Sequence, residues 1–177
     1  MLFKFRIIND EEREFVRDIE ISGSSTFLDF HEVIQKELRY DSSQLASFFL
    51  TDEGWEKELE ITLIDMMNDG DQPTLVMKDA VIGDYLSSAG ERMLYVFDFF
   101  SERAFFIECM ETGTEKPGLV YPRVAFRTGE PPVQIQMDID QAPGEEEETY
   151  LNDLFNNEEI DDELLNEEGF DEFYPEE

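Results

Sequence analysis

Residues 25–40, which read STFLDFHEVIQKELRY, decide the fold of this chain. Apolar side chains recur within them at helical spacing, at Phe27, Phe30, Val33, Ile34 and Leu38. Thr26 and Asp29 form a Ser/Thr-x-x-acid signal for a helix start, because such side chains satisfy free amide hydrogens of the first turn. An apolar stripe must be buried, so the stretch predicts one main helix packed on flanking strands.

Short alternating or apolar runs on both sides of this helix predict those strands. Two runs precede it, at residues 2–8 and 15–21, and the polar turn between them indicates a hairpin. Further strands are expected after the helix, with one helical turn (81–86) among them, at 45–50, 59–63, 92–99, 104–110, 120–126 and 133–139. The run 92–99 is mostly apolar, which is typical of a central strand covered on both faces.

The order hairpin, helix, strand, strand, helical turn and strong strand is that of a β-grasp, or ubiquitin-like, domain. We therefore expect an α+β fold with one main helix on a mixed sheet and extra strands toward the C-terminus. An unspecified α+β sandwich is the competing architecture. The domain is expected to span residues 1–140, and an acidic tail, 141–177, to begin at a Pro- and Glu-rich linker.

Charge is the unusual feature of the composition. The chain has 13 Lys and Arg against 45 Asp and Glu, for a net charge of −32, and no basic residue follows Asp138. Phosphate binding needs clustered Lys and Arg, so nucleic acid is disfavoured as a direct partner, and an anionic membrane surface is disfavoured for the same reason. A basic protein is the expected partner; the alternative is that the acidity only keeps the protein in solution.

The tail mixes its acidic residues with apolar ones. We expect the apolar residues to contact a partner, and they include Leu151, Leu154, Phe155, Leu164, Leu165, Phe170 and Phe173. Short helices around 150–156 and 158–168 fit the pattern, although acidic-hydrophobic segments often stay disordered until they meet a partner. Docking of these residues onto the protein's own sheet is the alternative.

No stretch carries a reaction signature. His31 is the only histidine and is expected to be structural, near the sheet edge. Asp98 lies between aromatic residues in a predicted strand, so it needs a partner, and we expect a structural ion pair with Arg92 or Arg103. Phosphate loops, nucleophile elbows and converging metal ligands are absent from the sequence pattern, which predicts a protein that is not an enzyme and holds no cofactor or metal.

The expected location is the cytoplasm. Cys109 is the only cysteine, so no intrachain disulfide can form, and its apolar surroundings indicate an inert buried thiol. The N-terminus lacks the apolar run of a signal peptide, and no stretch reaches the roughly 18 uncharged apolar residues that a membrane-spanning helix needs.

Two blocks of residues carry a family resemblance. The first, FLDFHEVIQ at 27–35 followed by YDSSQL at 40–45, is similar to a family helix in which His-x-Val-Ile-Gln leads into aromatic-Asp-x-Ser/Asp-His-Leu, with Gln44 in place of the second histidine. The second, IGDYL at 82–86 with GERMLYVFDF at 90–99, is similar to Leu-x-Asp-Leu and Gly-Asp-x-Phe-x-Tyr-x-Tyr-Asp-Phe. On these blocks, roughly residues 1–130 resemble the plasmid Ri open-reading-frame-three family, also labelled TnpR-family passenger proteins of insertion elements.

The resemblance implies an α+β domain without an assigned activity. The chain departs from the family pattern where Gly-Asp-x-Trp is replaced by residues 100–103, and where a Cys-Pro-Pro-Glu-Asp-x-Gly-Gly stretch is reduced to 121–123 and 129–131. A serine-recombinase arrangement of nucleophile and arginines is absent, and the charge has the wrong sign for DNA.

These observations favour a non-enzymatic interaction protein whose rigid domain presents a sheet surface or edge and whose acidic tail engages a basic protein or the domain itself. A DNA mimic that occupies a nucleic-acid-binding protein is the second hypothesis, and it requires two ordered rows of carboxylates. A cryptic enzyme, with a pocket that gathers His31, Asp98 and an arginine, is the third and least favoured.

Overall fold

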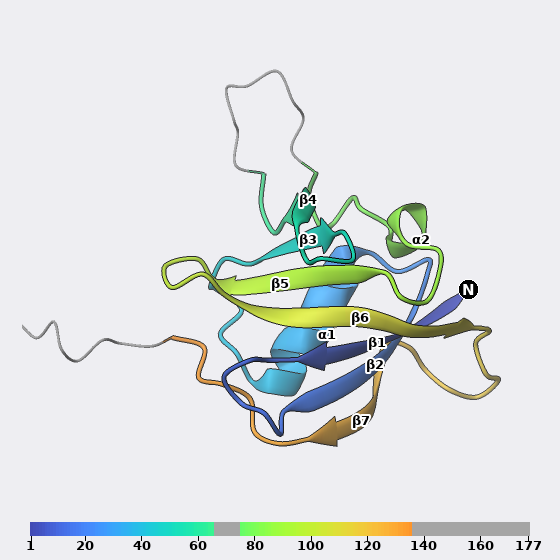
Figure 1. The fold of residues 1–177 in the computed structure, drawn as a ribbon. Coiled ribbons are helices and arrows are strands. Elements are labelled where there is room, and N and C mark those ends of the chain that lie inside the picture. The colour runs from blue at the N-terminus through green and yellow to red at the C-terminus, as the bar shows by residue number, and fades with distance from the viewer. Residues whose placement is uncertain (66–74, 136–177) are drawn as a thin grey trace, which may run out of the picture. The chain divides into compact units, whose positions relative to one another are not determined.

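The structure, a computed structural model, describes residues 1–65 and 75–135, which belong to one compact unit, Met1–Gln136. One main helix, α1, lies across one face of a seven-stranded sheet with the strand order β4-β3-β5-β6-β1-β2-β7 (Figure 1). In chain order the elements are β1 (Leu2–Ile8), β2 (Val16–Ser22), α1 (Phe27–Leu38), β3 (Ser47–Thr51), β4 (Lys57–Thr62), α2 (Ile82–Tyr85), β5 (Arg92–Asp98), β6 (Arg103–Gly113) and β7 (Arg123–Thr128).

The expected α+β fold with one main helix is confirmed, but the expectation of a mixed sheet is wrong. Every pair of neighbouring strands among the described residues is antiparallel. In a ubiquitin-like sheet, β5 would lie beside β1 in parallel. Here β6 follows β5 in a hairpin and lies between β5 and β1. It is antiparallel to both of these strands. The sheet is also larger than a β-grasp, and that finer resemblance is not confirmed.

Helix α1 forms where its local signals place it. The Thr26 hydroxyl accepts the Asp29 amide at 3.1 Å, and the Asp29 carboxylate accepts the Thr26 amide at 2.7 Å, which completes a capping box. The helix ends at Leu38, where Arg39 takes the left-handed conformation with φ 58° and its amide bonds the Gln35 carbonyl.

Aromatic rings from the helix and the sheet make up much of the core. The Phe30 ring stacks between Phe5 and Phe48, with centroids 5.1 and 5.4 Å away. Residues 93–97 of β5 are all buried, so the expectation of a buried central strand is confirmed. Burial of whole aromatic side chains on this scale is the main source of stability.

The strand expected at 133–139 is wrong over its described part. Residues 133–135 form no strand, and Val133 and Ile135 are 65% and 52% exposed. The backbone carbonyls of Val133 and Gln134 accept hydrogen bonds from the Arg103 guanidinium, which holds this segment in an irregular path. The rest of that stretch and the whole acidic tail lie outside the described residues.

Candidate functional site

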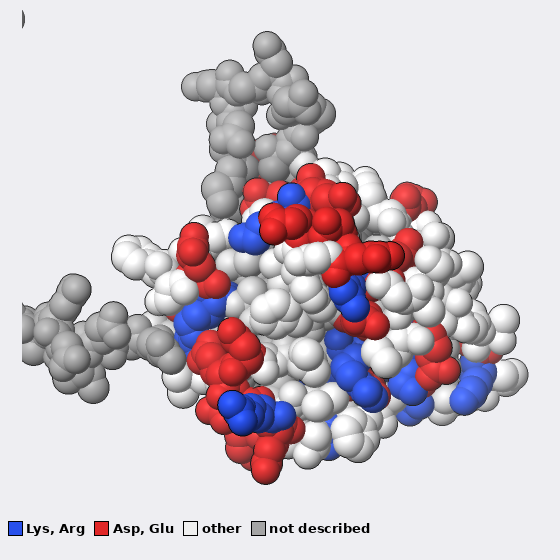
Figure 2. Space-filling view, viewed as in Figure 1, with Lys and Arg blue, Asp and Glu red and all other residues white. Residues whose placement is uncertain are grey.

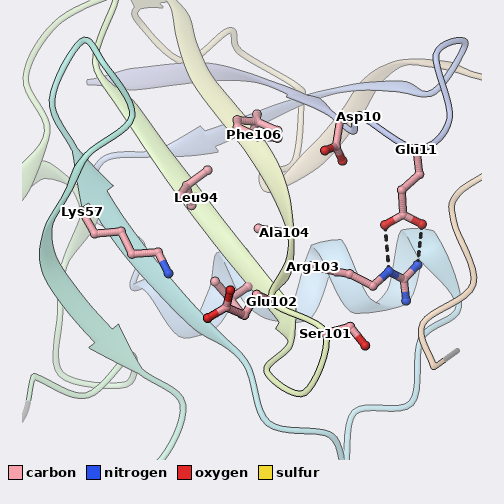
Figure 3. A pocket seen from close by; sticks show the side chains of 10 residues that line it. Asp10, Glu11, Lys57, Leu94, Ser101, Glu102, Arg103, Ala104 and Phe106 are labelled. Carbon is pink, nitrogen blue, oxygen red and sulfur yellow. Dashed lines mark hydrogen bonds and ion pairs between the residues drawn. The ribbon is translucent and has the colours of Figure 1, made fainter.

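The sheet face opposite α1 carries the candidate site. Figure 2 shows this face, on which uncharged atoms occupy the centre and acidic side chains gather over the β3–β4 region and near the β1–β2 turn. A hollow of about 460 Å³ lies over β5 and β6. Its floor includes the apolar side chains of Leu94, Ala104 and Phe106 (Figure 3). Val96 lines it as well.

The floor follows from strand alternation. Met93, Tyr95 and Phe97 face α1, so Leu94 and Val96 point to the opposite face. The β3–β4 turn shields part of this face, because the Trp55 ring stands edge-on to Phe106 with centroids 5.0 Å apart. Ala104 adds almost no volume beside these large side chains, which leaves the hollow open.

Charged side chains form the rim of the hollow. Lys57 reaches over it from the β4 side, while Asp10 and Glu11 come from the β1–β2 turn on the opposite side (Figure 3). Lys57 Nζ lies 4.3 Å from the centroid of the Phe49 ring and makes no ion pair with a described carboxylate. Glu102 closes one end. The floor is therefore apolar, and the rim has more negative than positive charge.

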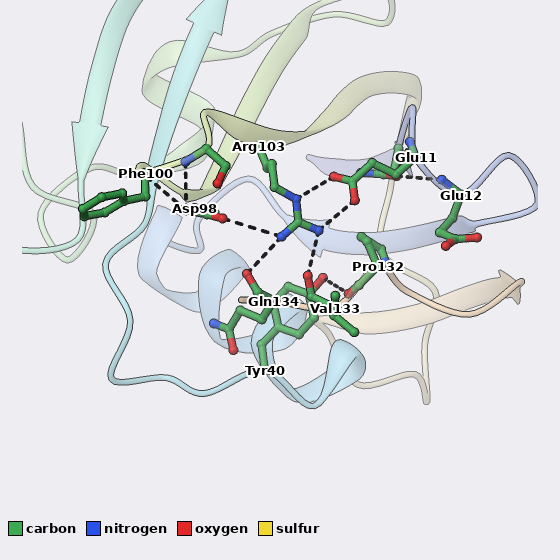
Figure 4. Close-up of polar contacts among 11 residues, drawn as sticks. Glu11, Glu12, Tyr40, Asp98, Phe100, Arg103, Pro132, Val133 and Gln134 are labelled. Atoms are coloured by element: carbon green, nitrogen blue, oxygen red, sulfur yellow. Dashed lines mark hydrogen bonds and ion pairs between the residues drawn. The ribbon is translucent and has the colours of Figure 1, made fainter. Parts of the chain in front are cut away.

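Arg103 joins three separate segments beside this hollow (Figure 4). Its guanidinium donates to both carboxylate oxygens of Glu11, at 2.7 and 2.8 Å, and to the carbonyls of Val133 and Gln134, at 2.7 and 3.3 Å. Its side chain is only 8% exposed. The hydrogen bonds with Glu11 raise the pKa of Arg103 above its ordinary value. We call this group the Arg103 clamp; it fixes the β5–β6 hairpin to the β1–β2 turn and to residues 133–134.

The tip of the β5–β6 hairpin is built by the Asp98 side chain. One carboxylate oxygen of Asp98 accepts the amides of Phe100 and Ser101, at 3.0 and 3.2 Å. Glu102 then adopts the left-handed conformation with φ 52° and returns the chain to β6. The Phe100 side chain is left fully exposed at the tip. This tip lies where the chain departs from the Gly-Asp-x-Trp pattern of the family.

The ion pair expected at Asp98 forms with one of its two candidate partners. Asp98 Oδ2 lies 3.6 Å from Arg103 Nη1, although the main partner of Arg103 is Glu11. Pairing with Arg92 is wrong, because Arg92 and Asp98 stand at opposite ends of β5, and Arg92 bonds Glu108 on β6 at 3.0 Å instead. The seven candidate partner-binding residues of the tail lie outside the described residues.

His31 lies in the core, not near the sheet edge as expected. The Tyr95 hydroxyl accepts a hydrogen bond from Gln35 Nε2 at 2.6 Å and shares a second hydrogen bond, 2.7 Å long, with His31 Nδ1. Burial lowers the pKa of His31 to about 4, which keeps the imidazole neutral at pH 7. The two sequence blocks that carry the family resemblance therefore meet in a structural network.

Sequence reasoning missed the hollow and most of the Arg103 clamp. The alternation of side chains in 92–99 and 104–110 predicts that the floor residues share one face of the sheet. It does not predict that this face lacks a covering helix. Glu11 is 92 residues from Arg103 in sequence, and no local pattern links them.

Neither a metal-binding cluster nor a low-pKa thiol is found among the described residues. Within residues 1–65 and 75–135, no group of three or more His, Cys, Asp or Glu side chains could hold a metal ion. Burial raises the pKa of the Cys109 thiol to about 11, so the thiolate is scarce at pH 7. Among the same residues, no helix is long and apolar enough to cross a membrane.

Comparison with known proteins gives a family and a fold. No curated protein matches the chain. The crystal structure of MM3350 from Methanosarcina mazei Go1, a protein of unknown function, is similar with a TM-score of 0.56 and 20% identity, over 71% of this chain and 68% of that one. The model of the plasmid pRiA4b ORF-3-like proteins matches residues 2–171. The chain therefore belongs to the plasmid pRiA4b ORF-3-like protein family.

Proposed function

We propose that this protein is a non-enzymatic interaction module that binds a basic protein partner across the open face of its sheet. The observation that carries the proposal is the apolar floor of the hollow, bordered by Asp10 and Glu102, whose carboxylates have no ion-pair partner among the described residues. An apolar centre with a charged rim is the usual anatomy of a protein interface.

The charge balance of the described surface supports the sign of the partner. Eight of the 13 Lys and Arg residues already form ion pairs with described carboxylates. Few cations are left to offset the remaining Asp and Glu side chains, so the surface potential is negative. Such a potential increases the rate at which a positive partner associates and repels acidic ones.

The acidic tail adds to the same attraction. It contributes 16 of the 45 acidic residues and no basic one, so it raises the local concentration of a cationic partner. Apolar residues of the tail, such as Leu154 and Phe155, supply contact area in addition to charge. In this proposal the tail sets the association rate and the salt dependence, whereas the hollow selects the partner.

A DNA mimic is the second candidate. Glu58 and Glu60 are both exposed on β4, where the register shift at Glu58 interrupts regular alternation, so they supply at most one short row of carboxylates. A mimic of duplex phosphates needs two such rows, and the described residues supply only this one. A basic protein with an apolar contact side chain therefore fits the site better than a protein that recognises only phosphate spacing.

The test uses the full chain and a synthetic amphipathic peptide of lysine and leucine as the probe. In the variant Ala104→Tyr the new side chain fills the hollow from its floor, and the same change at Ala125, which is exposed on β7, is the matched control. Ala104→Tyr is expected to weaken binding by about tenfold, the equivalent of roughly 1.4 kcal/mol, while Ala125→Tyr leaves it within about twofold.

Charge variants separate the rim from the floor. Asp10→Asn with Glu102→Gln should reduce the dependence of the dissociation constant on salt, because two carboxylates no longer attract the peptide. Equal affinities for the Ala104→Tyr and Ala125→Tyr variants would show that the peptide binds elsewhere, and the proposed contact surface would then be wrong.

A further inference from the structure

Strand β4 is an edge of the sheet, and the described residues bond only some of the backbone groups on its outer side. The Thr62 amide donates to the Leu75 carbonyl at 2.9 Å, and the Met77 amide donates to the Thr62 carbonyl at 2.8 Å. The backbone groups of Thr62 therefore point away from β3. Because this direction repeats at every second residue, the amide and carbonyl of Glu60 point to the same outer side. Among the described residues they have no backbone partner there.

The neighbouring positions of β4 are also incompletely paired. The register with β3 shifts between Leu59 and Lys57, so Glu58 has no residue opposite it. Ile61 is fully buried beneath the sheet, and alternation places Leu59 on that same side, yet Leu59 is 39% exposed. A further strand laid along this edge would cover Leu59 and bond the backbone groups of Glu60 that have no backbone partner within residues 1–65 and 75–135.

We propose that the outer edge of β4 accepts an extended segment of the basic partner as an eighth strand, in which Lys or Arg alternates with apolar residues. Backbone hydrogen bonds to Glu60 supply affinity, and alternate side chains supply specificity. The basic side chains of the added strand lie beside Glu58 and Glu60, and its apolar side chains pack beside Leu59 on the face that carries the core. The proposal rests on the proposed function for the sign of the partner's charge, and it names the segment by which the partner binds.

Charge excludes the nearest competing occupant, a second copy of this chain. Antiparallel pairing of two β4 edges about Leu59 would place Glu58 of each copy opposite Glu60 of the other. Like charges directly opposite each other destabilise a strand pair, so the same carboxylates that attract a basic strand prevent self-association. The other edge strand, β7, carries Arg123 and Arg127 and offers no such complement to a basic strand.

The test uses the full chain and the peptide acetyl-Lys-Val-Lys-Val-Lys-Val-Lys-amide. Two analogues of this peptide carry N-methyl groups on the backbone, one at every Lys and the other at every Val. A peptide strand that joins a sheet hydrogen-bonds through only one of its own two edges, and the amides of Lys and Val lie on opposite edges. One N-methylated analogue should therefore lose affinity, and the other should keep it. The expected loss is about tenfold or more, since at least one backbone hydrogen bond disappears. The unmodified peptide should also slow exchange of the Glu60 amide, measured by NMR.

Protein variants provide the second arm. The double variant Glu58→Lys with Glu60→Lys should lose about tenfold in affinity for the unmodified peptide. The control, Glu32→Lys with Glu115→Lys, changes the net charge equally at exposed positions away from β4 and should stay within about threefold.

The outcomes distinguish the two levels of the proposal. If both N-methylated analogues bind as tightly as the unmodified peptide and the Glu60 amide stays unprotected, strand addition is overturned and the proposed function still stands. Failure of every cationic peptide to bind, including the lysine–leucine probe, would overturn both.

Discussion

Replacing Arg103 with methionine removes the charge that holds three segments together. The guanidinium makes two hydrogen bonds to Glu11 and two to the carbonyls of residues 133 and 134, while its side chain is only 8% exposed. Loss of one partner from a fully buried pair costs about 3–5 kcal/mol, because the other charge stays buried and unpaired. Glu11 is 30% exposed and can regain some water, so we expect a loss of about 3 kcal/mol.

The assay is urea denaturation of the full chain, followed by fluorescence of Trp55, the only tryptophan, and by circular dichroism. Arg123→Met is the matched control, since Arg123 is 38% exposed and bonds Glu20 through a single contact. Because the Arg123 side chain stays open to water and makes one contact, this pair contributes about 1 kcal/mol or less. The two variants make the same chemical change, so the difference between them measures the effect of burial and of the additional bonds.

A double-mutant cycle with Glu11→Gln isolates the pair itself. The combined variant Glu11→Gln with Arg103→Met should lose less stability than the sum of the single losses, because the carboxylate left behind by Arg103→Met is absent. The reasoning is refuted if Arg103→Met costs no more than Arg123→Met, or if the two changes in the cycle are additive.

Three further predictions concern the core and the end of α1. Tyr95→Phe should cost about 1–3 kcal/mol in urea denaturation, because it leaves buried polar atoms of His31 and Gln35 without a partner. The pKa of His31 is about 4 in the folded state and near 6.5 when unfolded, so the unfolded state binds the extra proton first. The stability advantage of the wild-type protein over His31→Gln should therefore be full above about pH 6.5 and shrink as pH falls toward 4; an advantage constant over that range would contradict the assignment. Arg39→Gly should raise the free energy of unfolding by about 0.5–1 kcal/mol, because glycine adopts the left-handed conformation without the steric cost; lower stability in thermal unfolding would count against this.

The sequence by itself determined the helix and most of the strands, because the signals for these are local. The capping residues Thr26 and Asp29 and the apolar spacing up to Leu38 act over a few residues, and the helix begins and ends where they indicate. The mostly apolar run 92–99 likewise predicted a buried central strand. Composition alone also determined that the protein is strongly acidic.

Only the tertiary structure decided how the strands are ordered and which face of the sheet stays open. The insertion of β6 between β5 and β1 turns a predicted mixed sheet into an antiparallel one, and strand pairing of this kind depends on contacts between residues far apart in the chain. The same holds for the contact of Arg103 with Glu11 and for the position of β4 at the edge of the sheet. Local periodicity determines which side chains share a face, whereas the contacts between distant segments determine what, if anything, covers that face.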